Sequence, residues 1–206
     1  IGLPLGARLG ADMTELFPGM AATSRLEEYA DVVRLGKARD FPEVNGADRT
    51  TKGRIYTVRA FPLRGRSLGI TFEDITERKR ADDDRARLAA IVESSDDAII
   101  GKSLEGVVTS WNAAAERVIL FTAADMVGSE ASRFIPESRR EEESRLMERV
   151  RLGEHVTSFE TLRLRKDGTE VQVSVTLSPI RNEAGESTGT STIARDITET
   201  KRMELA

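Results

Sequence analysis

The residues Asp74-Ile75-Thr76-Glu77, followed by Lys79-Arg80, recur near the end of the chain as Asp196-Ile197-Thr198-Glu199, followed by Lys201-Arg202. Each of the two stretches closes a run of strand-like sequence. An internal repeat of this kind has to be recognised first, because it decides the architecture of the whole chain. The pattern predicts one type of domain that occurs twice.

A second pair of matching motifs fixes the alignment of the two copies. Leu9-Gly10 precedes Pro18 at the spacing at which Val127-Gly128 precedes Pro136. From about Asp97 the second copy also contains two strands and a helix that have no counterpart in the first. We therefore expect that the first copy lacks its opening and that the chain is cut from a longer polypeptide. The expected domains are a truncated copy at 1–76, a linker or signalling helix at 77–94, a complete copy at 95–198 and the start of an output helix at 199–206.

The composition is that of an ordinary soluble protein, with 39% hydrophobic and 32% charged residues in a chain of 206. No segment is long and apolar enough to span a bilayer. The absence of cysteine excludes disulfides, thiolate metal sites and any cofactor that is held through a thiol. The formal net charge of −4 argues against nucleic-acid binding, which needs a concentrated basic surface.

The second copy is the more complete and shows element patterns throughout. Val171, Val173, Val175 and Leu177 alternate with polar residues, which is typical of a strand with one buried face. Asn112 precedes a helical run and is expected to be its N-cap. We expect helices at 83–94, 113–118, 123–128 and 137–152, the last buried through Leu146, Met147 and Val150, and strands at 97–100, 107–111, 156–165, 171–177 and 188–197. This order predicts an α+β fold in which helices lie over one face of a five-stranded antiparallel sheet.

A single helix is expected to connect the two copies. Residues 75–94 contain neither proline nor glycine, and Thr76 is the natural N-cap of the helix. Ala81, Leu88 and Ile91 could form a thin apolar seam for a partner helix, which is too short to be a stable coiled coil alone. A plain solvated spacer is the alternative.

Three motifs of the second copy carry a family resemblance. They are Trp111-Asn112-Ala113-Ala114-Ala115-Glu116-Arg117, Arg165-Lys166-Asp167-Gly168 and Ala194-Arg195-Asp196-Ile197-Thr198-Glu199. In this order they resemble a PAS domain, with its closing PAC motif, of the bacterial sensory kind, and the first copy resembles the same family. One position departs from the family, which usually has glycine where this chain has Leu120. Glycine would permit a left-handed helix end, so Leu120 implies a different helix exit or a strained one.

The resemblance implies a small cavity that holds haem, flavin or an organic acid in some relatives. Haem sensors of the family use a histidine from the long helix, but residues 137–152 contain none, and the only histidine, His155, follows that helix. Without cysteine, a thiol-linked flavin or chromophore is excluded. Non-covalent flavin or a small organic ligand stays open, and Trp111 could stack on its ring, although we favour a packing role. Glu141-Glu142-Glu143 is interpreted as a solvated helix face rather than a metal site.

The resemblance also implies a sensory, signal-transduction module. In relatives the closing strand runs straight into a helix, so Asp74, Thr76, Asp196 and Thr198 are expected to relay the signal. The output domain is expected in the same parent chain beyond the fragment, with the sensor histidine kinase of a two-component system as the first expectation. We further expect a cytoplasmic protein that forms a homodimer through PAS faces and flanking helices.

Two alternatives stay open. One is a ligand-free PAS module for dimerisation or protein interaction, and the other is the sensor region of a diguanylate cyclase or phosphodiesterase. The sequence contains no catalytic constellation, so the fragment is not expected to be an enzyme. The truncated first copy is expected to be unstable unless another chain supplies strands, because its unpaired sheet edges would be exposed.

Overall fold

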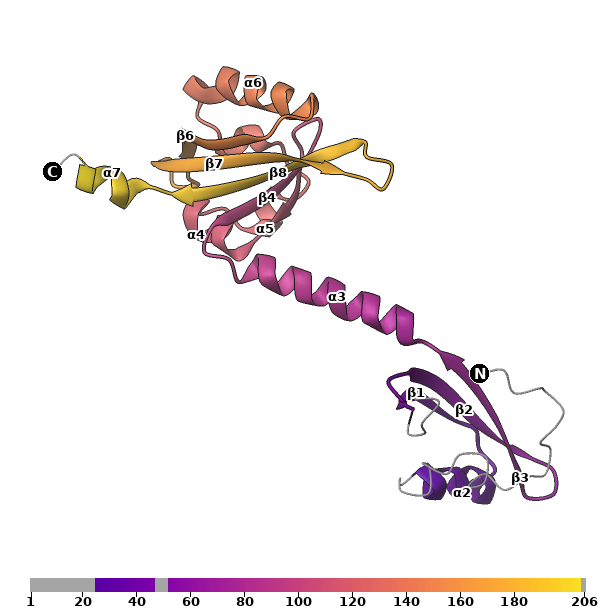
Figure 1. The fold of residues 1–206 in the computed structure, drawn as a ribbon. Helices are drawn as coiled ribbons and strands as arrows, with labels where there is room; N and C mark the ends of the chain where they lie inside the picture. The colour runs from indigo at the N-terminus through magenta and orange to yellow at the C-terminus, as the bar shows by residue number, and fades with distance from the viewer. Residues whose placement is uncertain (1–24, 47–51, 205–206) are drawn as a thin grey trace. The chain divides into compact units, whose positions relative to one another are not determined.

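The computed structural model describes residues 25–46 and 52–204 (Figure 1). By internal packing the chain divides into two units, Ile1–Ala86 and Arg87–Ala206. The division falls within helix α3 (Thr76–Glu93), which is the predicted connecting helix. In the described part of the chain, no helix has both the length and the apolar character that a membrane crossing requires.

In the first unit, helix α2 packs on an antiparallel sheet of order β1-β2-β3. These elements are α2 (Arg25–Leu35), β1 (Arg39–Asn45), β2 (Ile55–Leu63) and β3 (Ser67–Asp74). Their shared core contains Tyr29, Val32, Phe41, Tyr56, Val58 and Ala60. The repeat landmarks Leu9-Gly10 and Pro18, and the opening that we expect to be truncated, lie outside the described residues.

The second unit contains a five-stranded antiparallel sheet of order β5-β4-β8-β7-β6, which confirms the predicted sheet. Its strands are β4 (Ala98–Ser103), β5 (Val108–Trp111), β6 (Val156–Leu164), β7 (Glu170–Arg181) and β8 (Ser187–Asp196). Its helices are α4 (Ala113–Ile119), α5 (Ala123–Met126), η2 (Ala131–Phe134), η3 (Glu137–Arg139), α6 (Arg140–Arg151) and α7 (Thr198–Glu204).

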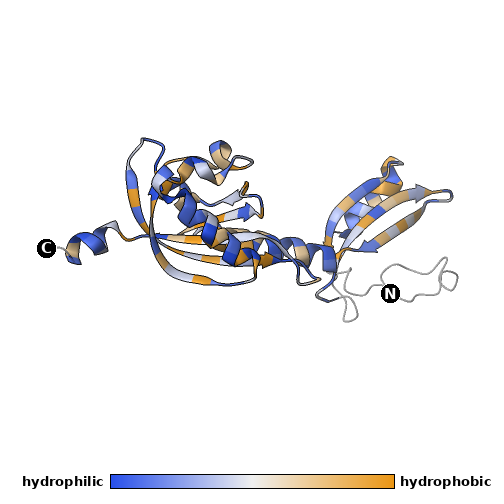
Figure 2. Ribbon diagram, turned by 90° about the horizontal axis from the view of Figure 1, so that it is seen from above, coloured by the Kyte–Doolittle hydropathy of each residue, from blue (hydrophilic) through white to orange (hydrophobic). Residues whose placement is uncertain are grey.

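One hydrophobic core lies between the sheet and its helices. The alternating residues Val171, Val173, Val175 and Leu177 of β7 are all buried in it, as predicted. Helices α4, α5 and α6 contribute Ile119, Met126 and Val150 among others. The alternation of hydrophobic and hydrophilic residues along the strands is visible in Figure 2. The helical cover therefore lies on the inner face of the sheet, where any enclosed site has to be built.

Helix α4 begins and ends as the sequence predicts. The Asn112 side chain accepts a hydrogen bond from the Ala115 amide (2.9 Å), which confirms the N-cap. At the other end Leu120 adopts φ 65° and ψ 12°, and its amide donates to the Glu116 carbonyl (2.9 Å). The helix exit is thus left-handed although glycine is absent, so the second of the two expected outcomes, local strain, is confirmed.

Replacing Leu120 by glycine is expected to raise the free energy of unfolding by about 0.5–1 kcal/mol. A residue with a side chain costs about 1–2 kcal/mol in the left-handed conformation, and glycine avoids this cost. Part of the gain is offset because glycine has greater conformational freedom in the unfolded chain. Little packing is lost, because Leu120 is 44% exposed. Urea unfolding followed by the fluorescence of Trp111, the only tryptophan, measures the change.

Val127→Gly is the matched control for this substitution. Val127 is also an exposed residue at a helix end, but its φ of −62° is ordinary for a residue with a side chain. Glycine should therefore lower stability there. Equal losses in both variants would show that Leu120 is not strained.

Candidate functional site

The first strand-to-helix junction contains Asp74 and Thr76, two of the predicted relay residues. An Asp74 carboxylate oxygen accepts a hydrogen bond from the Thr76 amide (3.0 Å), and the Ile75 amide donates to the Ile55 carbonyl (2.9 Å). The Thr76 hydroxyl accepts from the Ile55 amide (2.9 Å), which fastens the helix start to β2. The hydroxyl and amide of Thr76 both donate to Asp74 and lower the pKa of its carboxyl.

The second junction brings Asp196 and Thr198 together in the same way. An Asp196 carboxylate oxygen accepts from the Thr198 amide (2.8 Å), and the Ile197 amide donates to the Gln172 carbonyl of β7 (3.0 Å). One contact differs, because the buried hydroxyl of Thr198 has no hydrogen-bond partner among the described residues. Helix α7 therefore lacks the side-chain contact that fastens the start of α3.

An ion pair that we did not predict completes each junction. Lys201 of α7 pairs with Glu160 of β6 (2.9 Å), and Lys79 of α3 pairs with Glu43 of β1. Both lysines belong to the repeated motif, which is the signal that could have revealed them. Exposed pairs of this kind contribute little stability. Their effect is to connect each helix to a second strand of its sheet.

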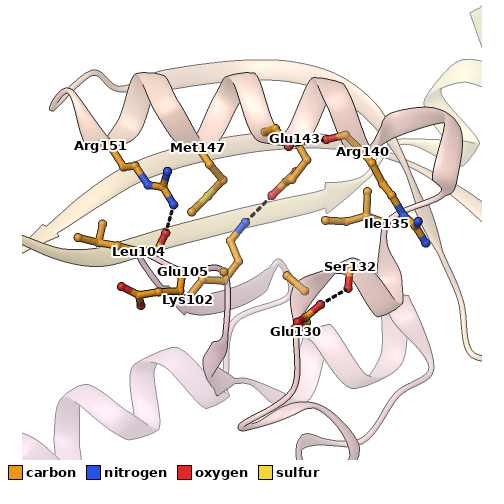
Figure 3. A pocket seen from close by; sticks show the side chains of 13 residues that line it. Lys102, Leu104, Glu105, Glu130, Ser132, Ile135, Arg140, Glu143, Met147 and Arg151 are labelled. Atoms are coloured by element: carbon orange, nitrogen blue, oxygen red, sulfur yellow. Dashed lines mark hydrogen bonds and ion pairs between the residues drawn. The ribbon is translucent and has the colours of Figure 1, made fainter.

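A groove of about 310 Å³ lies in the second unit between α6 and the turn that joins β4 to β5 (Figure 3). This volume is at the small end of the range for small-molecule sites. Apolar side chains such as Ile135 and Met147 line it together with charged ones. The charged lining residues are Lys102, Glu105, Glu130, Arg140, Glu143 and Arg151.

A buried cluster of ion pairs forms the floor of this groove. Lys102 Nζ lies 2.5 Å from one carboxylate oxygen of Glu143, and Arg163 Nη2 lies 2.9 Å from the other. The side chains of Lys102, Arg163 and Glu143 are only 1%, 3% and 10% exposed. Buried charges are expensive unless they are paired, so Glu143 is required to hold both cations in place.

No pattern in the sequence predicted this cluster. The interpretation of Glu141-Glu142-Glu143 as a solvated face is wrong for Glu143, which turns towards the sheet because α6 packs there through Leu146 and Val150. Lys102 is buried because β4 continues past its predicted end at residue 100 and keeps the inward register of Ile100.

The pKa values of the cluster reflect burial and charge together. Burial alone would raise the pKa of Glu143, but the charges of Lys102 and Arg163 outweigh it and lower the pKa below its ordinary value. For Lys102, burial is the dominant effect and lowers the pKa, although Glu143 opposes it. The Glu143 carboxylate is therefore ionised at neutral pH. The pKa of Lys102 depends on the balance between its burial and the charge of Glu143.

The family model described as the PAS fold matches residues 92–202, which is more than half of the chain. The chain belongs to the PAS fold family. The match covers the five-stranded sheet, the groove and the second junction, so the resemblance found in the sequence is confirmed for residues 92–202. The comparison with curated proteins gives no match.

Solved PAS structures share this fold. The PAS domain of a protein from Colwellia psychrerythraea and that of an HTR-like protein from Haloarcula marismortui are each 24% identical, with a TM-score of 0.52. They cover 58% and 59% of this chain, and 98% of each of their own chains is matched. An RNA-binding light-oxygen-voltage receptor is 14% identical at a TM-score of 0.52, with coverage of 95% of this chain and 87% of its own.

The remaining predicted residues of the PAS domain lie away from the groove. Trp111 is buried in the core, its indole N–H donates to the Phe121 carbonyl (3.0 Å), and its ring meets Phe134 edge-on. This position fits the packing role that we favoured for Trp111, and the residue does not line the groove. His155 is exposed just before β6, 3.2 Å from the Ser178 hydroxyl.

Proposed function

We propose that the chain is a sensory, signal-transduction module that relays a ligand, redox or partner cue through its helices. The observation that carries this proposal is the repeated junction, in which Asp74 and Asp196 each lead a closing strand into a helix through the same hydrogen bonds. The module is proposed to be cytoplasmic and non-catalytic. Its output domain lies in the same parent chain and is that of a sensor histidine kinase, or else of a diguanylate cyclase or phosphodiesterase.

A path of paired strands supports a relay from the groove to helix α7. Lys102 of β4 lies opposite Thr190 of β8 in the sheet, and β8 ends at Asp196, just before α7. The Thr190 hydroxyl also lies 3.9 Å from the Met147 sulfur in the groove. A ligand that shifts α6 would therefore disturb the strand that leads into the output helix.

We also propose that the first unit is a truncated copy of the same domain. The described elements α2, β1, β2, β3 and α3 follow the same order as α6, β6, β7, β8 and α7. Strand β3 has no buried residue, whereas the equivalent β8 buries Gly189, Thr190, Thr192 and Ala194. This difference is expected if β3 lacks the additional strands that pair with and cover β8.

Replacing Asp196 by alanine is expected to speed amide exchange at Thr198 and in the first turn of α7 by about fivefold. The carboxylate caps this helix, and losing a cap costs about 1 kcal/mol, which sets the size of the change. Exchange in residues 171–177 should stay the same, because the sheet core is untouched. Hydrogen exchange read by mass spectrometry measures both regions.

Asp167→Ala is the control for the junction. The Asp167 carboxylate accepts from the Thr169 amide (2.9 Å) in the same local geometry, but within the turn between β6 and β7. Its loss should leave α7 unaffected. If Asp196→Ala changes α7 no more than Asp167→Ala does, the junction does not control the helix and the relay proposal fails.

A ligand-free dimerisation module is the second candidate, because α3 exposes an apolar strip. Leu88 and Ile91 are 64% and 57% exposed on neighbouring turns of this helix. If they form the contact of a homodimer, Leu88→Glu should convert a dimer to a monomer in sedimentation experiments. Ala86→Glu, on the opposite side of α3, should leave the dimer intact. A wild-type chain that is monomeric at all concentrations would eliminate this candidate.

A further inference from the structure

Strand β3 forms one edge of the sheet in the first unit (Figure 1). On one side it pairs with β2 in an unbroken register over the whole of Ser67–Asp74. On its other side no strand among the described residues pairs with it. The backbone groups along that side are therefore free to bind another strand.

The free backbone groups belong to alternate residues of β3. The Ile75 amide, just past the strand, donates to the Ile55 carbonyl at the start of β2. Hydrogen-bonded pairs alternate along an antiparallel ladder, so every second residue of β3 turns its amide and carbonyl away from β2. These residues include Leu68, Ile70 and Phe72.

The other edge strands of the two sheets are protected against pairing. Strand β1 contains Pro42 and an irregular register, and β6 has an irregular register around Ser158, which adopts φ 50°. Strand β5 is covered, because Val108 exchanges hydrogen bonds with Gly128 and Ser129. Natural sheets prevent edge-to-edge association by such devices.

Strand β3 has none of these devices. Neither proline nor an irregular register interrupts it, and its residues from Ser67 to Phe72 are uncharged. Leu68 and Ile70 are half-buried against the core of the unit, whereas Phe72 is 44% exposed although it meets Tyr56 edge-on. An uncharged edge with a partly covered apolar face favours pairing with a further strand.

The second unit shows what such a strand has to provide. Strand β3 pairs with β2 as β8 pairs with β7, since the residue after each closing aspartate donates to a carbonyl of the neighbouring strand. On its other side β8 binds β4 antiparallel, with the buried Ile100 opposite Thr192. Ile70 occupies in β3 the place of Thr192 in β8. A strand that binds β3 is therefore expected to place an apolar residue opposite Ile70.

Strand β3 itself meets this requirement. When two copies of β3 pair antiparallel about Ile70, the two Ile70 residues lie opposite each other. Each Leu68 then lies opposite Phe72 of the second copy, so all three inward positions are apolar. A two-fold contact needs such a self-complementary strand.

The charges at the ends of β3 agree with the same register. Arg66, in the turn before β3, has no ion-pair partner in the described part of the chain and comes opposite Asp74 of the second copy. Asp74 already pairs with Arg54 (3.0 Å) but its side chain is 37% exposed, which leaves room for a second guanidinium. Glu73 comes opposite Ser67, so no like charges meet.

From these observations we infer that β3 pairs with β3 of a second copy of this chain, antiparallel about a two-fold axis at Ile70. The two sheets join into one of order β1-β2-β3-β3-β2-β1, and the pairing covers the exposed part of Phe72. The contact is made by the first unit alone and is separate from the apolar strip on α3. It holds whether or not the module relays a signal.

Ile70→Cys tests the register, because the chain contains no cysteine. At the two-fold axis the two Cα atoms are expected about 5.5 Å apart, a separation that a disulfide can bridge. Glutathione disulfide should therefore link most of the 206-residue chains into dimers that dithiothreitol separates. Thr71→Cys is the matched control, since Thr71 comes opposite Gly69 and should stay unlinked. Equal linking of the two variants, or no linking of Ile70→Cys, would overturn the inference.

Ile70→Pro tests the free edge. The Ile70 amide points away from β2, so proline removes no hydrogen bond of the β2–β3 ladder and is tolerated at such an edge position. It removes both amide donors at the two-fold axis, and the dissociation constant of the dimer should rise at least about tenfold in sedimentation equilibrium. Ile70→Ala loses the same side chain but keeps the amide, so it should weaken the dimer less than about fivefold.

Amide exchange followed by NMR needs no variant and serves if Ile70→Pro fails to fold. As the concentration of the wild-type chain rises, exchange at Leu68, Ile70 and Phe72 should slow at least about tenfold, while Gly69 and Thr71 change little. Protection of the first three that does not depend on concentration would show that the same chain covers its own edge, and would overturn the inference.

Two further results would also overturn the inference. One is a wild-type chain that stays monomeric at millimolar concentration. The other is a dimer that persists in Ile70→Pro and dissociates in Leu88→Glu, because the contact would then belong to α3. If β3 forms the contact, Leu88→Glu should stay dimeric.

Discussion

Replacing Glu143 by glutamine is expected to lower the free energy of unfolding of the Arg87–Ala206 unit by about 3–5 kcal/mol. The substitution keeps the shape of the side chain but removes the only carboxylate that pairs with Lys102 and Arg163 in the described residues. Two buried cations would then face each other without a counterion. The Lys102 ammonium can escape part of this cost only by releasing its proton.

Urea unfolding monitored by Trp111 fluorescence measures this loss, because Trp111 is the only tryptophan and lies in the core of this unit. Glu141→Gln is the matched control on the same helix. Its side chain is 90% exposed and its carboxylate lies 3.5 Å from Arg145, so the loss of the charge should change stability by less than about 0.5 kcal/mol. Similar effects of the two substitutions would mean that the cluster is solvated.

The difference between the wild type and Glu143→Gln should also depend on pH. The pKa of Glu143 is lower in the folded state than its ordinary value of 4.5. Its stabilising contribution is therefore complete above pH 4.5 and is lost as the pH falls through the folded-state pKa. The two unfolding free energies should converge in acid. A difference that is constant down to that range would show that the ionised carboxylate is not what stabilises the cluster.

Asn112→Ala is expected to cost about 3 kcal/mol of stability. The Asn112 side chain is buried, accepts from the Ile99 and Ala115 amides (2.9 Å each), and donates to the Val92 carbonyl (2.9 Å). Alanine removes a helix cap, worth about 1 kcal/mol, and leaves buried backbone groups without partners at about 1–3 kcal/mol. Because Val92 lies in α3, the end of that helix should also become more mobile.

Asn112→Asp separates the two roles of this side chain. Aspartate keeps the acceptor for the Ala115 amide but cannot donate to Val92, so the cap should survive while the end of α3 exchanges faster. Asn182→Ala is the control, because the Asn182 side chain bonds only within the exposed turn between β7 and β8. Equal exchange in α3 for all three variants would show that Asn112 does not anchor the connecting helix.

The fold could be predicted because its signals are local. The alternation of Val171 to Leu177 marks one strand, Asn112 marks a helix start, and the sequence Asp-Ile-Thr-Glu marks both strand-to-helix junctions. Each of these signals depends on residues a few positions apart, and the structure places them as expected. For Leu120 the family resemblance left two outcomes open, a different helix exit or a strained one, and the structure shows the left-handed, strained exit.

The ion-pair cluster could not be predicted because its members are distant in sequence. Glu143 lies 41 positions from Lys102 and 20 from Arg163, and only the packing of α6 on the sheet brings them together. The hydropathy pattern of β6 is misleading, because Arg163 is buried while its neighbours Leu162 and Leu164 are only half-buried. Hydropathy alone would have placed the arginine outside.

The second junction also shows which residues hold the helix that follows a closing strand. At this junction, Asp196 and Ile197 form hydrogen bonds with Thr198, Gln172, Arg165 and Lys201, all within the unit that the strand closes. The start of α7 is thus held by residues of its own unit. A helix of a different sequence could therefore follow this strand without any change in the hydrogen bonds that close the unit.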